Sequence, residues 1–109
     1  MATTYKVLGQ SAPAGTTATS LYTVPSATQA VVSTINVVNV NSASDIIRIA
    51  VRPAGASLSA QHYIVYELNL PGYATFTYTA GVTLDTTDVI TIYSTSGHSS
   101  FSAFGSEIA

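Results

Sequence analysis

The sequence has very few charged residues, and two other residue types are missing altogether. Its 109 residues include three Lys or Arg and five Asp or Glu, together 7% of the chain. An ordinary soluble domain carries about a quarter of its residues as these types. The absence of cysteine excludes disulfides and thiolate metal sites. The absence of tryptophan removes the largest aromatic platform on which a protein stacks a sugar ring.

Basic residues and long apolar runs are also scarce. The three basic residues are Lys6, Arg48 and Arg52, too few to form the basic groove that nucleic-acid binding needs. Apolar runs such as Val31-Val32 and Ile46-Ile47 fall far short of the ~20 residues of a membrane-spanning helix. The N-terminus lacks the basic start and apolar stretch of a signal peptide. We therefore expect no nucleic-acid or membrane partner and no secretion by that route.

The residues that are abundant, Val, Ile, Thr and Tyr, are typical of β-strands. Apolar and polar residues alternate with a period of two in short segments about ten residues apart, with turn residues between them. This pattern predicts one all-β domain over residues 1–109, an antiparallel β-sandwich similar to a jelly roll. The eight expected strands are Tyr5–Gly9, Leu21–Val24, Val31–Val40, Ile46–Val51, His62–Leu70, Ala74–Ala80, Val89–Tyr93 and Phe101–Ile108.

The alternation also predicts which side chains face the core. Tyr66 and Tyr78 are in phase with apolar neighbours and are assigned to the core, whereas Tyr63 shares the opposite phase with Glu67. The expected inward positions are Val31, Ser33, Ile35 and Val37; Ile47, Ile49 and Val51; Ile64, Tyr66, Leu68 and Leu70; and Phe76, Tyr78 and Ala80.

Two loops are of interest for assembly. The loop 11–17 is rich in small residues, so residues 1–15 are a candidate arm or an edge strand that is exchanged between subunits. The loop 53–61 is a second candidate contact region, and within it residues 57–61 fit either a short strand or one helical turn.

The scarcity of charge indicates an assembly component rather than a free enzyme, because a surface with so few charges is poorly protected against association. We expect a homo-oligomer, a dimer or a trimer. An antiparallel strand pair would bring Arg48 or Arg52 opposite Glu67, as a surface ion pair or as an orienting contact in an interface. The candidate interface residues are Tyr5, Lys6, Arg48, Arg52, His62, Tyr63 and Glu67.

Motifs for catalysis and cofactor binding are not found. His62 and His98 are the only histidines, and neither lies in a nucleophile motif or in a zinc-binding pattern. The glycines lack the spacing of a phosphate-binding loop. Asp85 and Asp88 form either a weak cation site or, as we favour, a turn held by side-chain to backbone bonds. We predict a protein that is not an enzyme and has no metal or cofactor.

Four stretches together carry a family resemblance: Leu21–Pro25, Val31–Asn39, Ile49–Gly55, and Thr83–Thr91 with Phe104–Ile108. They are strand cores and turns rather than chemical motifs, and they span most of the chain. The sequence resembles small β-sandwich virion proteins of tailed bacteriophages, especially those of cyanobacteria. The resemblance implies a capsid decoration (cement) protein that binds the major capsid protein, or a module of the neck, tail or fibre. It also implies location in the virion, assembled in the host cytoplasm. The tyrosines leave a glycan-binding β-sandwich as a further alternative.

Overall fold

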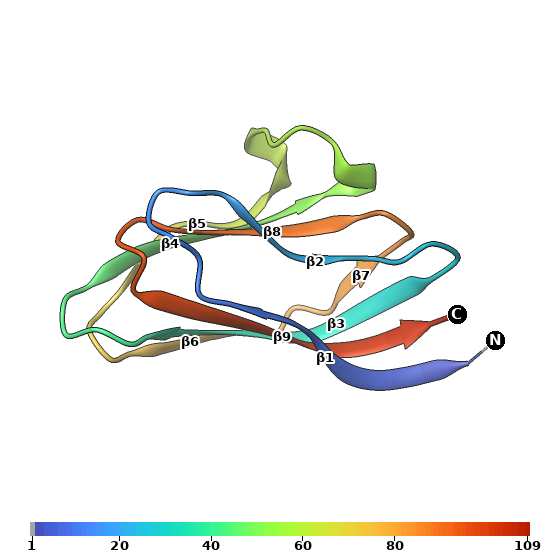
Figure 1. Cartoon of the computed structure of the whole chain (residues 1–109), viewed down its shortest axis with the longest axis horizontal. Helices are drawn as coiled ribbons and strands as arrows, with labels where there is room; N and C mark the ends of the chain where they lie inside the picture. Colours follow the sequence, from blue (N-terminus) through green and yellow to red (C-terminus); the bar gives the residue numbers. More distant parts are fainter. Residues whose placement is uncertain (1) are drawn as a thin grey trace.

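Nine β-strands make up most of residues 2–109, the part of the chain that this computed structural model describes (Figure 1). Two single turns of 3₁₀ helix lie between β4 and β5, and no helix within residues 2–109 is long and apolar enough to cross a membrane. In chain order the elements are β1 (Thr3–Ser11), β2 (Thr19–Thr23), β3 (Gln29–Asn39), β4 (Asp45–Arg52), η1 (Pro53–Gly55), η2 (Ala60–His62), β5 (Tyr63–Leu70), β6 (Thr75–Tyr78), β7 (Val82–Leu84), β8 (Val89–Ser94) and β9 (Ser99–Ile108).

The strands pair as one long hairpin that is rolled up on itself. β1 pairs with β9, β2 with β8, β3 with β6 and β7, and β4 with β5, and every pair is antiparallel. Rolling adds the pairs of β3 with β9 and of β4 with β8. The result is a first sheet in the order β1-β9-β3-β6, with β7 also beside β3, and a second sheet in the order β2-β8-β4-β5. Figure 1 shows the two sheets stacked as layers. This nested pairing is a jelly roll, so the predicted all-β antiparallel sandwich is confirmed.

The core fills the space between the two sheets with aliphatic and aromatic side chains. Ile47 and Ile49 of β4 and Phe101 of β9 are fully buried, and the alternation predicted the two isoleucines correctly. Tyr78 packs against the core from β6, as expected. Ala80 is exposed, against the prediction, because β6 ends at Tyr78 and the alternation does not continue beyond it.

The predicted inward face of β3 is half right because a β-bulge interrupts this strand. Ile35 and Val37 are buried as predicted, but Ala30 and Val32 are the buried residues of the first half, in place of Val31 and Ser33. The register against β9 shifts between Val32 and Thr34. One extra residue at a bulge exchanges the two faces of a strand.

A buried carboxylate fastens the second sheet to the first. Asp45 begins β4, is only 2% exposed, and accepts a 2.5 Å hydrogen bond from the Ser99 hydroxyl of β9. It also accepts hydrogen bonds from the Ser94 hydroxyl and from the Ser96 backbone N–H. Burial alone raises the pKa of Asp45, but these hydrogen bonds outweigh it and hold the pKa well below its usual range. Asp45 therefore remains charged without a cationic partner.

The two loops named above take defined conformations. β1 folds back on β9 of the same chain and forms an edge of the first sheet, while exchange of this strand between subunits stays a prediction. Residues 60–62 form one turn of 3₁₀ helix, which resolves the choice between a short strand and a helical turn.

Candidate functional site

An arginine lies between two tyrosine rings on the outer face of the second sheet. The guanidinium carbon of Arg48 is 4.4 Å from the ring centre of Tyr93 and 4.8 Å from that of Tyr66, within the range of a cation–π contact. The Arg48 Nε donates a 2.5 Å hydrogen bond to a carboxylate oxygen of Glu67, and its terminal nitrogen forms an ion pair with the same group. Arg48 is therefore held on three sides, by two rings and a carboxylate.

The pairing of the strands explains why these groups meet. Arg48 of β4 lies directly opposite Tyr93 of β8. On its other side, Ile47 pairs with Leu68 and Ile49 with Val65, so that Tyr66 and Glu67 both oppose Arg48. This is a β-bulge, with two residues facing one, and Glu67, one of the two, has a left-handed backbone (φ 53°).

The bulge overturns the prediction for Tyr66. The alternation of β5 assigned Tyr66 to the core, but its side chain is 59% exposed. Before the bulge Val65 is buried, and after it Leu70 is buried, so the two halves of the strand follow opposite phases. The expected contact between Glu67 and an arginine of β4 is present, and Arg48 is the one that makes it.

A hollow of about 690 Å³ lies beside this cluster, lined by Leu58, Ser59, Ala60, Tyr63 and Tyr66. The rings of Tyr63 and Tyr66 meet edge to face, with centres 4.8 Å apart. The hollow is therefore lined by two aromatic rings from β5 and by Leu58, Ser59 and Ala60 from the segment before it. We name Arg48, Tyr63, Tyr66, Glu67 and Tyr93 the Arg48 surface. Sequence analysis singled out three of its members and missed Tyr66 and Tyr93, which only the bulge and the register bring to Arg48.

Two candidate interface residues, His62 and Arg52, make hydrogen bonds within the chain, and only His62 is buried. His62 is buried, and its Nδ1 accepts a 3.1 Å hydrogen bond from the backbone N–H of Ser59, which closes the turn that borders the hollow. Its assignment to an interface surface is wrong because it is the last residue of η2 and faces inward. Arg52 donates to the Thr91 hydroxyl at 2.9 Å and to the carbonyl oxygen of Ala56 at 3.0 Å, and so it fastens the 53–56 loop to β8.

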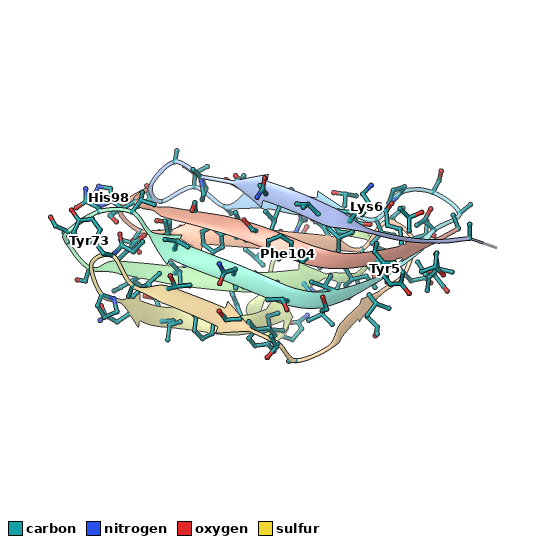
Figure 2. All side chains as sticks on the ribbon, turned by 90° about the horizontal axis from the view of Figure 1, so that it is seen from below. Tyr5, Lys6, Tyr73, His98 and Phe104 are labelled. Carbon is teal, nitrogen blue, oxygen red and sulfur yellow. The ribbon has the colours of Figure 1, made fainter. Side chains whose placement is uncertain are left out.

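Tyr5 and Lys6 lie on the other sheet, at the β1 edge. Figure 2 shows Tyr5 and Phe104 on the outer face of the first sheet, with Tyr73 at the opposite end of the molecule. The Lys6 ammonium pairs with Glu107 of β9 at 3.2 Å. The structure thus places Tyr5 and Lys6 on one sheet and the other five candidates on or beside the second sheet, where His62 is buried and Arg52 is half-buried.

The turn at residues 85–88 bonds to itself, as favoured from the sequence. One Asp88 oxygen accepts from the backbone N–H of Asp85 at 2.8 Å, and the other accepts from that of Ala54 at 2.9 Å. Asp85 accepts from the N–H of Thr86. Among residues 2–109 no group of three or more His, Cys, Asp or Glu is placed to hold a metal ion.

The two histidines differ in the hydrogen bonding of their Nδ1 atoms. The Nδ1 of His62 accepts a backbone N–H. The Nδ1 of His98 is buried and has no hydrogen-bond partner within the described chain.

All eight charged side chains form hydrogen bonds or ion pairs within the chain. Lys6 pairs with Glu107 and Arg48 with Glu67. The remaining four, Asp45, Arg52, Asp85 and Asp88, bind serine or threonine hydroxyls or backbone groups. The solvent-accessible surface of 5371 Å² therefore carries almost no charge that is not already engaged.

Comparison with known proteins gives no family for this chain, since no family model, curated protein or solved structure matches it.

Proposed function

We propose that this chain is a non-enzymatic structural protein of a virion, most specifically a capsid decoration protein that binds and bridges shell subunits and associates with itself. The observation that carries the proposal is the engagement of all eight charges within the chain. A surface of this size whose few charges are already engaged within the chain is poorly suited to a monomer in a crowded cell and well suited to lasting contact with other subunits. The proposed location in a virion rests on the resemblance of the sequence to virion proteins of tailed bacteriophages.

The Arg48 surface is the proposed contact with the shell. Tyrosine and arginine are among the residue types that most often dominate the energy of a protein interface. Here Tyr63 and Tyr66 line an open hollow, and Arg48 lies against the Tyr66 ring. Because Arg48 is already neutralised by Glu67, burying the pair leaves no unpaired charge. The function is mechanical: each copy ties neighbouring subunits together and so resists pressure from within the shell.

The copy number of the chain in purified virus particles whose genome encodes it tests the proposal. Mass spectrometry with isotope-labelled reference peptides measures the ratio of this chain to the major shell protein. A decoration protein is expected in a ratio near one copy per shell subunit, or a simple fraction of it. A few copies per particle would instead indicate a protein of the neck, tail or fibre. Absence of the chain from the particles would overturn the proposal.

Variants of the Arg48 surface test the contact itself. Shells stripped of this protein are mixed with purified chain and sedimented. Tyr66→Ala and Arg48→Lys are expected to weaken binding about tenfold or more, since truncating a dominant interface residue costs upwards of about 2 kcal/mol. Tyr73→Ala is the matched control, because Tyr73 is a comparably exposed tyrosine outside this surface. Equal binding by all three variants would exclude the Arg48 surface as the contact.

A glycan-binding module is the second candidate function, favoured by the hollow beside Tyr63 and Tyr66. Exposed aromatic rings next to hydrogen-bonding side chains can stack on a sugar ring. Saturable binding of a host polysaccharide that Tyr66→Ala abolishes, together with no binding to shells, would select this candidate.

A further inference from the structure

The β1 edge of the first sheet is uncovered and regular over five residues. Thr3 to Val7 are all exposed, and among the strands of residues 2–109 β1 is the outermost of this sheet. The apolar side chains of Tyr5 and Val7 on this strand and of Phe104 on β9 are exposed together. An edge of this kind has free backbone donors and acceptors and is a template for a further strand.

The hydrogen bonds at the chain ends show which backbone groups of β1 are free. Ala2 and Ala109 exchange both of their backbone hydrogen bonds, at 2.7 and 2.9 Å. In an antiparallel pair such residues alternate with residues whose N–H and C=O point the other way. With Thr3 opposite Ile108 and Tyr5 opposite Ser106, the backbone groups of Thr3, Tyr5 and Val7 therefore point away from β9, to the free edge.

The other edges of the sandwich are interrupted. The edge opposite β1 is divided between β6 and β7, with a gap after Tyr78. β5 contains the bulge at Glu67, and the register of β2 shifts between Ser20 and Tyr22. Breaks of this kind are a common means of preventing edge-to-edge association. In β1 the only shift comes after Val7, so residues 3–7 keep a regular edge.

We propose that two copies of this chain pair antiparallel through β1, about a twofold axis at Tyr5, and join their five-stranded first sheets into one continuous sheet. In this register Tyr5 faces Tyr5 of the second copy, and Thr3 faces Val7. Each pair exchanges two backbone hydrogen bonds, and the apolar side chains of both copies merge into one patch. Lys6 lies opposite Thr4 rather than opposite the other Lys6, and Glu107 already neutralises it, so no like charges face each other directly.

This pairing specifies the self-association within the proposed function, and it does not depend on which particle the chain joins. If the chain forms this dimer in solution but is not found in virus particles, the virion role alone is overturned. A chain that is abundant in particles but monomeric in solution and not crosslinked through position 5 would overturn the pairing alone.

Light scattering over a concentration series tests the pairing. The chain is expected at twice its 11.3 kDa mass at high concentration. Tyr5→Lys places two like charges opposite each other at the axis and is expected to raise the dissociation constant at least about tenfold, since such contacts cost several kcal/mol. Tyr73→Lys is the matched control, because Tyr73 is 71% exposed where Tyr5 is 84% exposed. A monomeric wild type, or equal dimerisation of both variants, would overturn the proposal.

A single cysteine tests the register directly, because the chain has none of its own. Hydrogen-bonded pairs in an antiparallel sheet have Cα atoms about 5.5 Å apart, within the span of a disulfide. Under mild oxidation Tyr5→Cys is expected to form a covalent dimer in most molecules, whereas Tyr73→Cys stays largely monomeric. Equal crosslinking of the two variants would rule out an axis at Tyr5.

Discussion

The hydroxyl of Tyr22 on β2 donates a 2.5 Å hydrogen bond to Glu107 on β9 and so connects the two sheets. The other oxygen of the same carboxylate accepts from Lys6 on β1. The hydrogen bond from Tyr22, followed by the contact with Lys6, lowers the pKa of Glu107. Burial, followed by the neighbouring carboxylate, raises the pKa of Tyr22, so the phenol keeps its proton and remains a donor at neutral pH.

Tyr22→Phe is expected to lower the free energy of unfolding by about 1 kcal/mol at pH 7, the usual net value of one hydrogen bond. Because the folded pKa of Glu107 is lowered, its contribution is present above the unfolded pKa of about 4.3 and is lost as the pH falls through the folded pKa. The difference between wild type and variant should therefore shrink below about pH 4. Urea denaturation at several pH values measures this, and a constant difference would argue against a charged acceptor.

Asp45→Asn is expected to cost about 2–3 kcal/mol at pH 7, because the buried hydroxyls of Ser94 and Ser99 lose a charged acceptor. The pKa of Asp45 is lowered, so its stabilising effect is present above the unfolded pKa of about 3.9 and lost as the pH falls toward the folded value. The stability of the wild type should decline below about pH 4 more steeply than that of the variant. Asp85→Asn, at an exposed turn, serves as the control and should change stability by less than about 0.5 kcal/mol.

Tyr66→Ala is expected to change the free energy of unfolding by less than about 1 kcal/mol, since the ring lies on the surface and loses only its contacts with Arg48 and Tyr63. Phe101→Ala, at a position with 0% exposure, should cost about 3–5 kcal/mol. Chemical denaturation of the two variants in parallel makes the comparison. If Tyr66→Ala lowered the free energy of unfolding as much as Phe101→Ala, Tyr66 would have to lie in the core. The bulge in β5 would then be contradicted.

Gly105→Ala is expected to destabilise the fold by more than about 2 kcal/mol, or to prevent folding. A Cβ atom at Gly105 would lie 2.0 Å from the carbonyl oxygen of Val31, and this oxygen belongs to the backbone of the paired strand β3, which cannot move aside cheaply. Gly81→Ala is the control, because its Cβ would meet nothing within 4 Å. Gly81→Ala is expected to lower the free energy of unfolding by only about 1 kcal/mol, because alanine is strained in a left-handed backbone (φ 67°). Thermal denaturation distinguishes the two, and similar melting temperatures would contradict the close approach of β3 and β9.

The β-bulges limited how well the core-facing side chains could be predicted from the alternation of apolar and polar residues. Period-two alternation located most strands and correctly assigned Ile47 and Ile49 of β4, which pair in unbroken register with β8. It failed in the first half of β3 and at Tyr66, where one extra residue exchanges the faces. Nothing in the local composition marks such a residue, because a bulge is a property of two paired strands and not of one.

The candidate site was predicted in part for the same reason. The pairing of an arginine on β4 with Glu67 followed from the expected antiparallel neighbours. The choice of Arg48, the stacking of Tyr66 and Tyr93 on it, and the burial of His62 depend on register and on the turn before β5. Sequence pattern does not determine any of these.

The sequence by itself determined the fold class and the shortage of charge, because strand propensity, alternation and composition are local properties. Only the tertiary structure decided where the eight charges go and which faces remain open. Ion pairs such as Lys6 with Glu107 join residues about a hundred positions apart in the chain, and they form only after the long hairpin has rolled up and brought the two ends side by side.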